Sequence, residues 1–272
     1  MKTKLKNLFI TGLAALAFTY GCTPPKNLGI VKESIVYSKA PLEATIENYG
    51  AKIQALEDVV ISHVSDNRII MFGEAHQIYR NDNDFVIKLL PKMKKQGFTY
   101  LALESERTAL GGLQKSLARH ISGKELSPEE KFFIEIGAPG WRDLADTAKK
   151  EGIKIVCYDA NSSEADNWNK REEVAYKNLN ELIFDKDPNA KVIVYCGAAH
   201  LNSKEEYSPY AADFDSNLIL NKGKKHKSLA YYLKKHTYDK TLTVSLIGHR
   251  DGIESDIVLN LDKGIVEHET KK

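Results

Sequence analysis

The sequence predicts an α/β fold in which a mainly parallel sheet carries helices on both faces. Short apolar runs rich in β-branched residues alternate with longer amphipathic runs from about residue 68 onward. The short runs are almost wholly apolar, as expected of strands that are covered on both sides in a parallel sheet. In open sheets of this kind, sites form beyond the carboxyl ends of the strands. The residues that end each apolar run are therefore the first candidates for chemistry.

The expected elements follow the chain in regular alternation. Strands are predicted at residues 68–74, 98–104, 153–160 and 191–200, with two late strands at 240–250 and 254–261. Helices are predicted at residues 82–97, 126–137, 140–152, 163–184 and 226–236. Residues 41–66 also have helical character. They are expected to pack on the sheet as an N-terminal addition within a single α/β domain that spans residues 41–272.

Two of the predicted helices carry specific local signals. In residues 82–97, Pro91 interrupts an apolar pattern of helical spacing, so a kink or a break is expected there. The helix at 126–137 opens with Ser127 as a cap and Pro128 at the first helical position. Glu130 stands at the third position, which completes the pattern of a capping box.

The first 21 residues are predicted to be a secretion signal. Three lysines precede an apolar run from Leu8 to Phe18, which is too short for a stable membrane span. The run ends in Gly21 and Cys22 and resembles a bacterial lipobox, where the signal is cut before the cysteine and the cysteine is acylated. Acyl chains such as palmitate on Cys22 would hold the protein on a membrane surface of the bacterial cell envelope. A soluble secreted protein is the alternative.

Composition limits the partners that the chain is expected to have. The formal net charge is +2, which gives no electrostatic case for nucleic acid. Residues 22–40 contain paired prolines and no periodicity, and are predicted to be a tether. Two further cysteines, Cys157 and Cys196, each stand near the end of an apolar run. A disulfide is permitted in an exported protein, and two buried thiols are at least as compatible with this pattern.

Ionisable residues stand at the predicted carboxyl ends of all four early strands. Any one of them is unremarkable, but burying several such groups is costly unless they are paired or used in chemistry. They are Glu74 and His76 after the first strand, Glu104 with Glu106 and Arg107 after the second, Asp159 in the third, and His200 after the fourth.

Two of these histidines share one motif, because glycine precedes each histidine by three positions in "GEAH" and "GAAH". Glycine permits a turn after a strand and a close approach of substrate. His76 can act as a general base near neutral pH, and Glu74 can fix its tautomer. Two histidines with carboxylates could instead bind a divalent metal, with His76, His200, Glu74 and Glu104 as candidate ligands. Alternatively, both histidines have structural roles, as helix caps or as packed side chains.

The order of these motifs resembles a known superfamily. "GEAH" after an apolar strand, "LALE" about thirty residues later and a late "GAAH" are similar to erythromycin esterases, Tiki/TraB proteins and ChaN-like haem-uptake lipoproteins. The resemblance implies that Glu74, His76, Glu104 and His200 line one site, and that Arg171 lies early in a long helix after the third strand. Some esterases of this superfamily have an extra residue between the glutamate and the histidine of the first motif.

The resemblance implies two alternative functions. The first is a hydrolase in which Glu74 and His76 activate water, with or without a metal, for a small-molecule or peptide substrate. The second is a ChaN-like protein that binds haem or another iron cofactor through a histidine or a tyrosine. The tyrosines near predicted strand ends are Tyr79, Tyr100, Tyr158, Tyr195 and Tyr207. No Gly-x-Ser-x-Gly elbow and no phosphate-binding glycine loop with lysine occurs.

Overall fold

The fold is taken from a computed structural model of the 272-residue chain. The structure describes residues 39–75, 80–106, 112–137, 139–161, 163–165, 167–205, 225–237, 239–248 and 254–269. The predicted secretion signal, the acylation site Cys22 and nearly all of the predicted tether lie outside these residues, as does His76. Among the helices that are described, none is long and apolar enough to cross a membrane.

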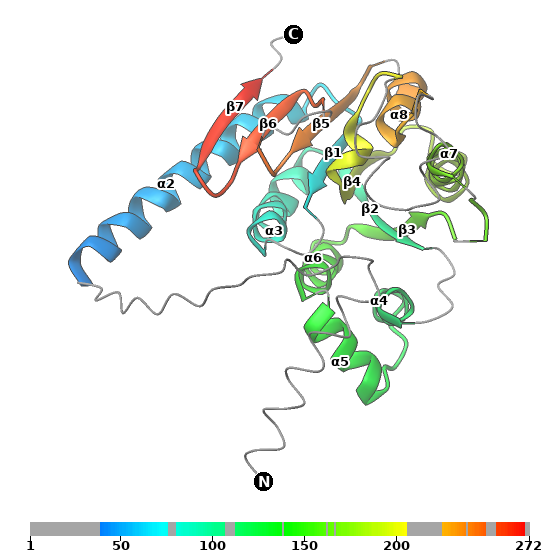
Figure 1. The fold of residues 1–272 in the computed structure, drawn as a ribbon, viewed down its shortest axis with the longest axis horizontal. Helices are drawn as coiled ribbons and strands as arrows, with labels where there is room; N and C mark the ends of the chain where they lie inside the picture. The colour runs from blue at the N-terminus through cyan, green and yellow to red at the C-terminus, as the bar shows by residue number, and fades with distance from the viewer. Residues whose placement is uncertain are drawn as a thin grey trace, which may run out of the picture.

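The predicted α/β fold is confirmed as one seven-stranded sheet with helices on both faces (Figure 1). The strand order is β3-β2-β4-β1-β5-β6-β7. All neighbouring strands are parallel except β6 and β7. The strands are β1 Ile69–Glu74, β2 Phe98–Glu106, β3 Lys154–Asp159, β4 Lys191–Gly197, β5 Thr241–Ser245, β6 Ile257–Asn260 and β7 Ile265–Glu269.

The last strand was not anticipated from the sequence. β7 is short and pairs antiparallel with β6 after a four-residue turn. Its first residue, Ile265, is 42% exposed, so the strand lacks the fully apolar pattern by which the inner strands are recognised. An edge strand is covered less than an inner one, and its sequence carries a weaker signal for that reason.

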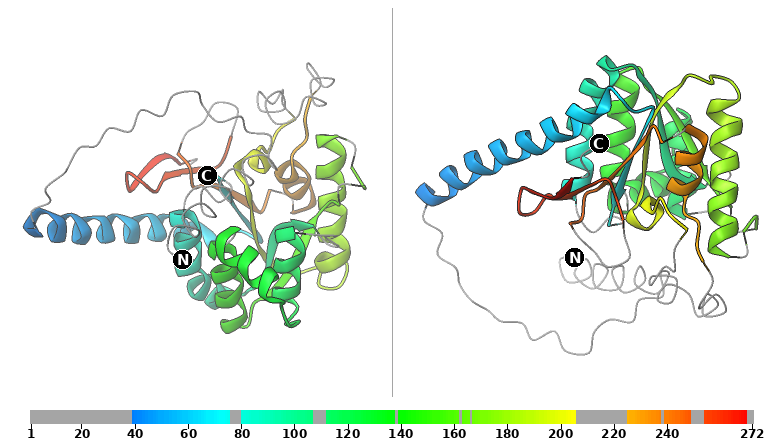
Figure 2. Two further views of the ribbon diagram at one scale, coloured as in Figure 1. Left: turned by 60° about the horizontal axis from the view of Figure 1, so that its bottom comes forward. Right: turned by 90° about the horizontal axis from the view of Figure 1, so that it is seen from above.

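Helices cover the two faces of the sheet in two separate groups (Figure 2). The first group is α2 Lys39–Val64, α3 Arg80–Lys95, α4 Gly112–Ile121, α5 Pro128–Gly137 and α6 Pro139–Lys150. The second group is α7 Trp168–Leu179, which continues into the π-helical turn η1 Asn180–Phe184, and α8 Leu229–Thr237. A short 3₁₀ turn, η2 Ala198–Leu201, follows β4 directly.

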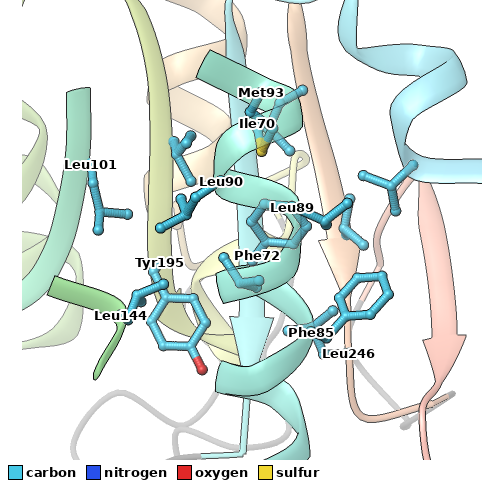
Figure 3. Close-up of a cluster of buried hydrophobic side chains, with 14 of the residues drawn as sticks. Ile70, Phe72, Phe85, Leu89, Leu90, Met93, Leu101, Leu144, Tyr195 and Leu246 are labelled. Carbon is cyan, nitrogen blue, oxygen red and sulfur yellow. The ribbon is translucent and has the colours of Figure 1, made fainter. Parts of the chain in front are cut away.

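Alternation along β1 explains why each face has its own core. Successive side chains of a strand point to opposite faces, so Ile70 and Phe72 pack towards α3 whereas Ile69 and Met71 pack towards α7 and α8. Figure 3 shows the first core, where Leu89 and other side chains of α3 pack against β1 and β4. Both faces of the strand are buried, which accounts for its continuous apolar sequence.

Two local expectations have different outcomes. The capping box is present: Ser127 N–H donates to Glu130 Oε2 at 2.9 Å, and Glu130 N–H donates to Ser127 Oγ at 3.2 Å. The alternative of a break at Pro91 was wrong, because α3 runs through Pro91 to Lys95. Leu90 and Met93 on either side of Pro91 are fully buried, and such packing outweighs the loss of one backbone hydrogen bond.

The two internal cysteines do not form a disulfide. Cys157 in β3 and Cys196 in β4 are both free thiols, and Cys196 is fully buried. Strand β2 lies between β3 and β4. Two strand spacings amount to about 9.6 Å, which is beyond the ~7 Å that a disulfide can span between Cα atoms. Of the two alternatives, free thiols are the correct one, with Cys196 buried and Cys157 only partly buried.

The sheet has a topological switch point between β2 and β4. From β2 the chain passes outward to β3, whereas from β4 it passes in the opposite direction to β5. The two connections therefore separate at the carboxyl ends of these neighbouring strands. In open α/β sheets, this is the place where ligands bind.

Candidate active site

His200 lies at the switch point with a carboxylate at each ring nitrogen. Its Nδ1 atom is 2.8 Å from Glu172 Oε2, and its Nε2 atom is 3.0 Å from Glu104 Oε1. All three residues are buried. A carboxylate beside each ring nitrogen favours a ring in which both nitrogens donate, which is the imidazolium form.

Two features of the chain place His200 there. Gly197 ends β4, and η2 begins at the next residue, so His200 follows the strand within one short turn. The turn packs on Gly73 of β1, where an added Cβ atom would lie 2.4 Å from Leu201 Cδ1 and 2.8 Å from Ala198 Cα. Gly73 therefore permits a close approach of η2, and not of substrate as expected. Gly197 has an ordinary φ of −64°, a backbone conformation that other residues also adopt.

Glu104 is held by donors from three different elements. Its Oε2 atom accepts from Gly197 N–H at 2.6 Å, while Oε1 accepts from Arg171 Nη2 at 2.6 Å and from His200 Nε2. Hydrogen bonds of this kind favour the ionised carboxylate. Glu104 thus links β2 to β4 and to α7 across the switch point.

Arg171 joins a third carboxylate to the cluster. Its Nε atom donates to Asp159 Oδ1 at 3.0 Å, and its Nη2 atom donates to Asp159 Oδ2 at 2.6 Å. The planar guanidinium can bind Asp159 through two atoms and still reach Glu104, which a lysine ammonium cannot do with the same geometry. Among these residues Arg171 is only half-buried, so it forms the solvent-facing side of the cluster.

Trp168 covers the imidazolium. Its ring stacks on the ring of His200, with centroids 5.0 Å apart and an interplanar angle of 27°, and Arg171 Cζ lies 5.3 Å from the Trp168 centroid. Both cations therefore contact the same aromatic ring, whose π-face attracts positive charge. We refer to Glu104, Asp159, Arg171, Glu172 and His200, with Trp168 above them, as the switch-point cluster.

The surroundings of the switch-point cluster decide its protonation. Burial alone would lower the pKa of His200, but the carboxylates of Glu104 and Glu172 outweigh it and raise that pKa to about 10. Burial also opposes the charge of Arg171, yet Glu104 and Asp159 raise the pKa of its guanidinium above the ordinary value. At neutral pH His200 is therefore a cation. It can stabilise negative charge or donate a proton, but it cannot act as a base.

Glu74 belongs to a second group on the other face of the sheet end. Tyr195 Oη donates to Glu74 Oε2 at 3.2 Å, and Trp141 of α6 packs edge-on against the Tyr195 ring. Burial, followed by the charges of Glu74 and Asp82, raises the pKa of Tyr195 well above its ordinary value. The two groups meet at Gly197, which is the register partner of Glu74 and the backbone donor to Glu104.

The structure thus places four of the five predicted catalytic residues at one edge of the sheet. Glu104 is hydrogen-bonded to both Arg171 and His200, and Glu74 lies in the adjoining group. His76 lies outside the described residues. Asp159, which the sequence placed at the end of β3, completes the contacts of Arg171.

The candidate metal ligands are engaged in other bonds. Both nitrogens of His200 face carboxylates, so neither has a lone pair for a metal ion. Within the described part of the chain, no group of three or more histidine, cysteine, aspartate or glutamate side chains is arranged to hold a metal.

The candidate haem ligands that the structure describes are also buried. Tyr158 and Tyr195 are fully buried, and burial raises the pKa of both phenols well above the ordinary value, which disfavours the tyrosinate that ligates haem iron. Tyr100 lies near the start of β2, away from the carboxyl ends. Tyr79 and Tyr207 lie outside the described residues.

Sequence reasoning missed Glu172 and Trp168. Both stand in the first turns of α7, beside the predicted Arg171. A residue within a helix is not marked by the end of a strand. The run Arg171-Glu172-Glu173 looks like a group of charged residues on a solvent-exposed surface. The available signal was spacing: residues 168, 171, 172 and 175 lie on one helical face, and Ala175 belongs to the core.

No known protein-family profile matches the chain. Among curated proteins, a multifunctional-autoprocessing repeats-in-toxin (MARTX) protein of Vibrio vulnificus is 27% identical over 168 residues. The match covers 58% of this chain but only 3% of that toxin.

Several solved structures have a similar arrangement of elements. The RRSP effector domain of a Vibrio vulnificus MARTX toxin is 18% identical with a TM-score of 0.45, over 82% of this chain and 40% of that one. An erythromycin esterase, EreC, is 8% identical with a TM-score of 0.48, over 70% of this chain and 73% of that one. The haem-binding ChaN of Campylobacter jejuni is 15% identical with a TM-score of 0.39, over 74% and 90%. The expected resemblance is supported in part. An erythromycin esterase and ChaN are among the similar structures, but a toxin effector domain scores in the same range. These scores assign no activity.

Proposed function

We propose that the chain is a hydrolase whose active site lies at the switch point, with His200 as its electrostatic centre. The observation that carries this proposal is the ring of His200, buried between the carboxylates of Glu104 and Glu172 where the connections from β2 and β4 diverge. A buried group with a strongly shifted pKa at a ligand-binding edge is typical of an enzyme site.

Each residue of the site has its own part in the proposed hydrolysis. Glu74, together with His76, is the proposed base that takes a proton from water, whose oxygen then attacks the carbonyl carbon of the substrate. The bond from that carbon to the alcohol or amine then breaks, and the base returns the proton to this leaving group. Negative charge develops on the carbonyl oxygen, and the positive charge of Arg171, which faces solvent, stabilises it, while His200 lies behind Arg171 and holds Glu104 in place. Glu104 keeps these two cations together at a fixed distance. Asp159 orients Arg171 from the opposite side.

Replacement of the central residues tests the proposal. Purified protein is assayed on a panel of esters and peptides, and then compared with His200→Gln and Glu104→Gln. Loss of one preorganised charge should lower kcat by about 10²-fold or more. Glu173→Gln is the matched control, since Glu173 is a neighbouring glutamate on the exposed face of α7 that pairs with Lys170 and Lys177. Wild-type kcat in a folded His200→Gln protein, or no turnover of any substrate by the wild type, would contradict the hydrolase.

The haem-binding alternative makes a different prediction. It needs an axial ligand, and His200, Tyr158 and Tyr195 are each buried or already engaged. Titration of the protein with hemin should therefore give no saturable shift of the Soret band. A sharp, saturable shift would favour haem binding over hydrolysis. It would direct the search for a ligand to His76, Tyr79 and Tyr207. Acylation at Cys22 and a place at the bacterial envelope remain predictions from the sequence.

A further inference from the structure

We propose that Glu172 is a positioning residue, which holds the ring of His200 in one orientation with both ring nitrogens donating. The inference rests on the hydrolytic role proposed above for His200. It adds the group that keeps His200 in its acid form, a role that no sequence motif assigned to Glu172.

The contacts of Glu172 join three elements at one atom. Oε2 of Glu172 accepts from His200 Nδ1 at 2.8 Å and from Leu229 N–H at 2.6 Å. Leu229 is the first residue of α8, His200 lies in η2, and Glu172 itself lies in α7. A shift of any of these elements therefore changes the position of the imidazole.

Burial separates this role from a catalytic one. Glu172 is 0% exposed, so a substrate cannot touch its carboxylate. Its second oxygen, Oε1, is also buried and makes no hydrogen bond to the described residues. Burying a carboxylate costs free energy when one of its two oxygens has no hydrogen-bond donor. Glu172 consequently depends on the positive charge of His200, and His200 depends on it in return.

The charges around His200 come from several elements that pack on it. Glu104 reaches it from β2 and Glu172 from α7, while Arg171 and Asp159 form the next layer from α7 and β3. From β4, the thiol of Cys196 stays neutral, because burial and the charges of Glu104, Glu172 and Glu74 raise its pKa well above the ordinary value. Helix α8 contributes through its backbone, at Leu229 N–H.

Neutralising Glu172 should lower the pKa of His200. Burial continues to oppose the charged ring, while one of its two carboxylate partners is lost. The proton on His200 should then be released closer to neutral pH. A purely structural ion pair would shift this titration as well, so the fall of kcat at unchanged KM is the readout that separates a positioning role from a structural one.

The experiment compares Glu172→Gln with wild type and with the control Glu173→Gln. In ¹⁵N-histidine-labelled protein, the His200 resonance is assigned by its absence in His200→Gln, and its ring nitrogens are followed from pH 5 to 10. Both should carry protons at pH 8 in wild type and control, whereas the midpoint should fall by more than one unit in Glu172→Gln. Turnover of the Glu172→Gln protein should fall at least tenfold at pH 8, recover in part at lower pH, and leave KM within twofold.

A second variant keeps the proposal open to refutation if Glu172→Gln does not fold. Glu172→Asp retains the charge but shortens the side chain by one methylene, so His200 should stay protonated while kcat falls. Wild-type kcat in Glu172→Asp, or an unchanged His200 titration in folded Glu172→Gln, would overturn the role of Glu172. The titration requires no substrate. If wild-type protein hydrolyses nothing but the titration behaves as stated, the hydrolase has failed while the coupling between Glu172 and His200 stands.

Discussion

Gly73 of β1 and Leu201 of η2 are in such close contact that no side chain fits between them. A Cβ atom at position 73 would lie 2.4 Å from Leu201 Cδ1, and also 2.8 Å from the backbone Cα of Ala198. His200 lies between Ala198 and Leu201 in the sequence. The glycine of the first Gly-x-x-His motif therefore supports the histidine of the second. Because Gly73 has no side chain, the turn that carries His200 can pack directly on β1.

Replacement of Gly73 by alanine should displace η2 and with it the ring of His200. The displaced atoms include backbone, which cannot simply rotate away, so the cost should be about 1–3 kcal/mol of unfolding free energy. Urea unfolding followed by tryptophan fluorescence measures this loss, and ¹⁵N shifts of His200 report its displacement.

Gly152→Ala is a suitable control for that variant. Gly152 has a φ of +66°, and the nearest atom to an added Cβ there is Lys94 Nζ at 4.0 Å. Alanine at this position should lower stability through backbone strain by about 1 kcal/mol, yet leave the His200 resonances where they are. Equal displacement of His200 in both variants would contradict the role assigned to Gly73.

Arg171→Lys should weaken both stability and turnover although charge is conserved. Lysine cannot bind the two oxygens of Asp159 and also reach Glu104 in the same plane. We expect a loss of about 1–3 kcal/mol in urea unfolding and at least a tenfold fall in kcat. Arg119→Lys provides the comparison, because Arg119 pairs with Glu130 on the surface and the exchange should change stability by less than about 0.5 kcal/mol. Arg171→Lys with wild-type stability would show that the bidentate contact is unimportant.

The charge of His200 should make stability depend on pH in the alkaline range. Its pKa in the folded protein is raised to about 10, above the ordinary value of 6.5. The stabilisation is thus complete below about pH 6.5 and is lost as the pH rises through about 10. Within this window, the free energy of unfolding of wild type, measured relative to that of His200→Gln, should fall by roughly 1.4 kcal/mol per pH unit. Parallel stability curves for the two proteins between pH 6 and 10 would refute a buried imidazolium.

The two internal thiols should differ in reactivity from an exposed cysteine. Burial is the main cause that raises the pKa of Cys157 and of Cys196. Because the thiolate is the reactive form, an aromatic disulfide reagent should label Cys196 slowly or not at all in native protein, and both thiols rapidly after denaturation. The measurement uses the Cys22→Ser protein, in which Cys157 and Cys196 are the two remaining cysteines. Rapid labelling of native Cys196 would indicate that the β4 end opens to solvent.

Much of the fold is predictable from local pattern. The inner strands β1, β2 and β4 are marked by apolar runs, and Ser127 with Glu130 sets the start of α5 in the manner the sequence predicts. Pro91 shows the limit of such reasoning, since packing of α3 on the sheet overrides a local preference. Strand β7 shows another, because a partly exposed edge strand lacks the apolar signal of an inner one.

Periodicity and chain order are enough to predict that the strands end in ionisable residues, and that Glu74, Glu104 and His200 lie at one edge of a parallel sheet. They suffice because parallel strands point their carboxyl ends the same way. The partners of His200 required the folded arrangement, which shows that both ring nitrogens are bound, that Glu172 is the second partner, and that Glu74 faces the other side. Those contacts depend on how α7 and η2 pack, and so on residues far apart in the chain.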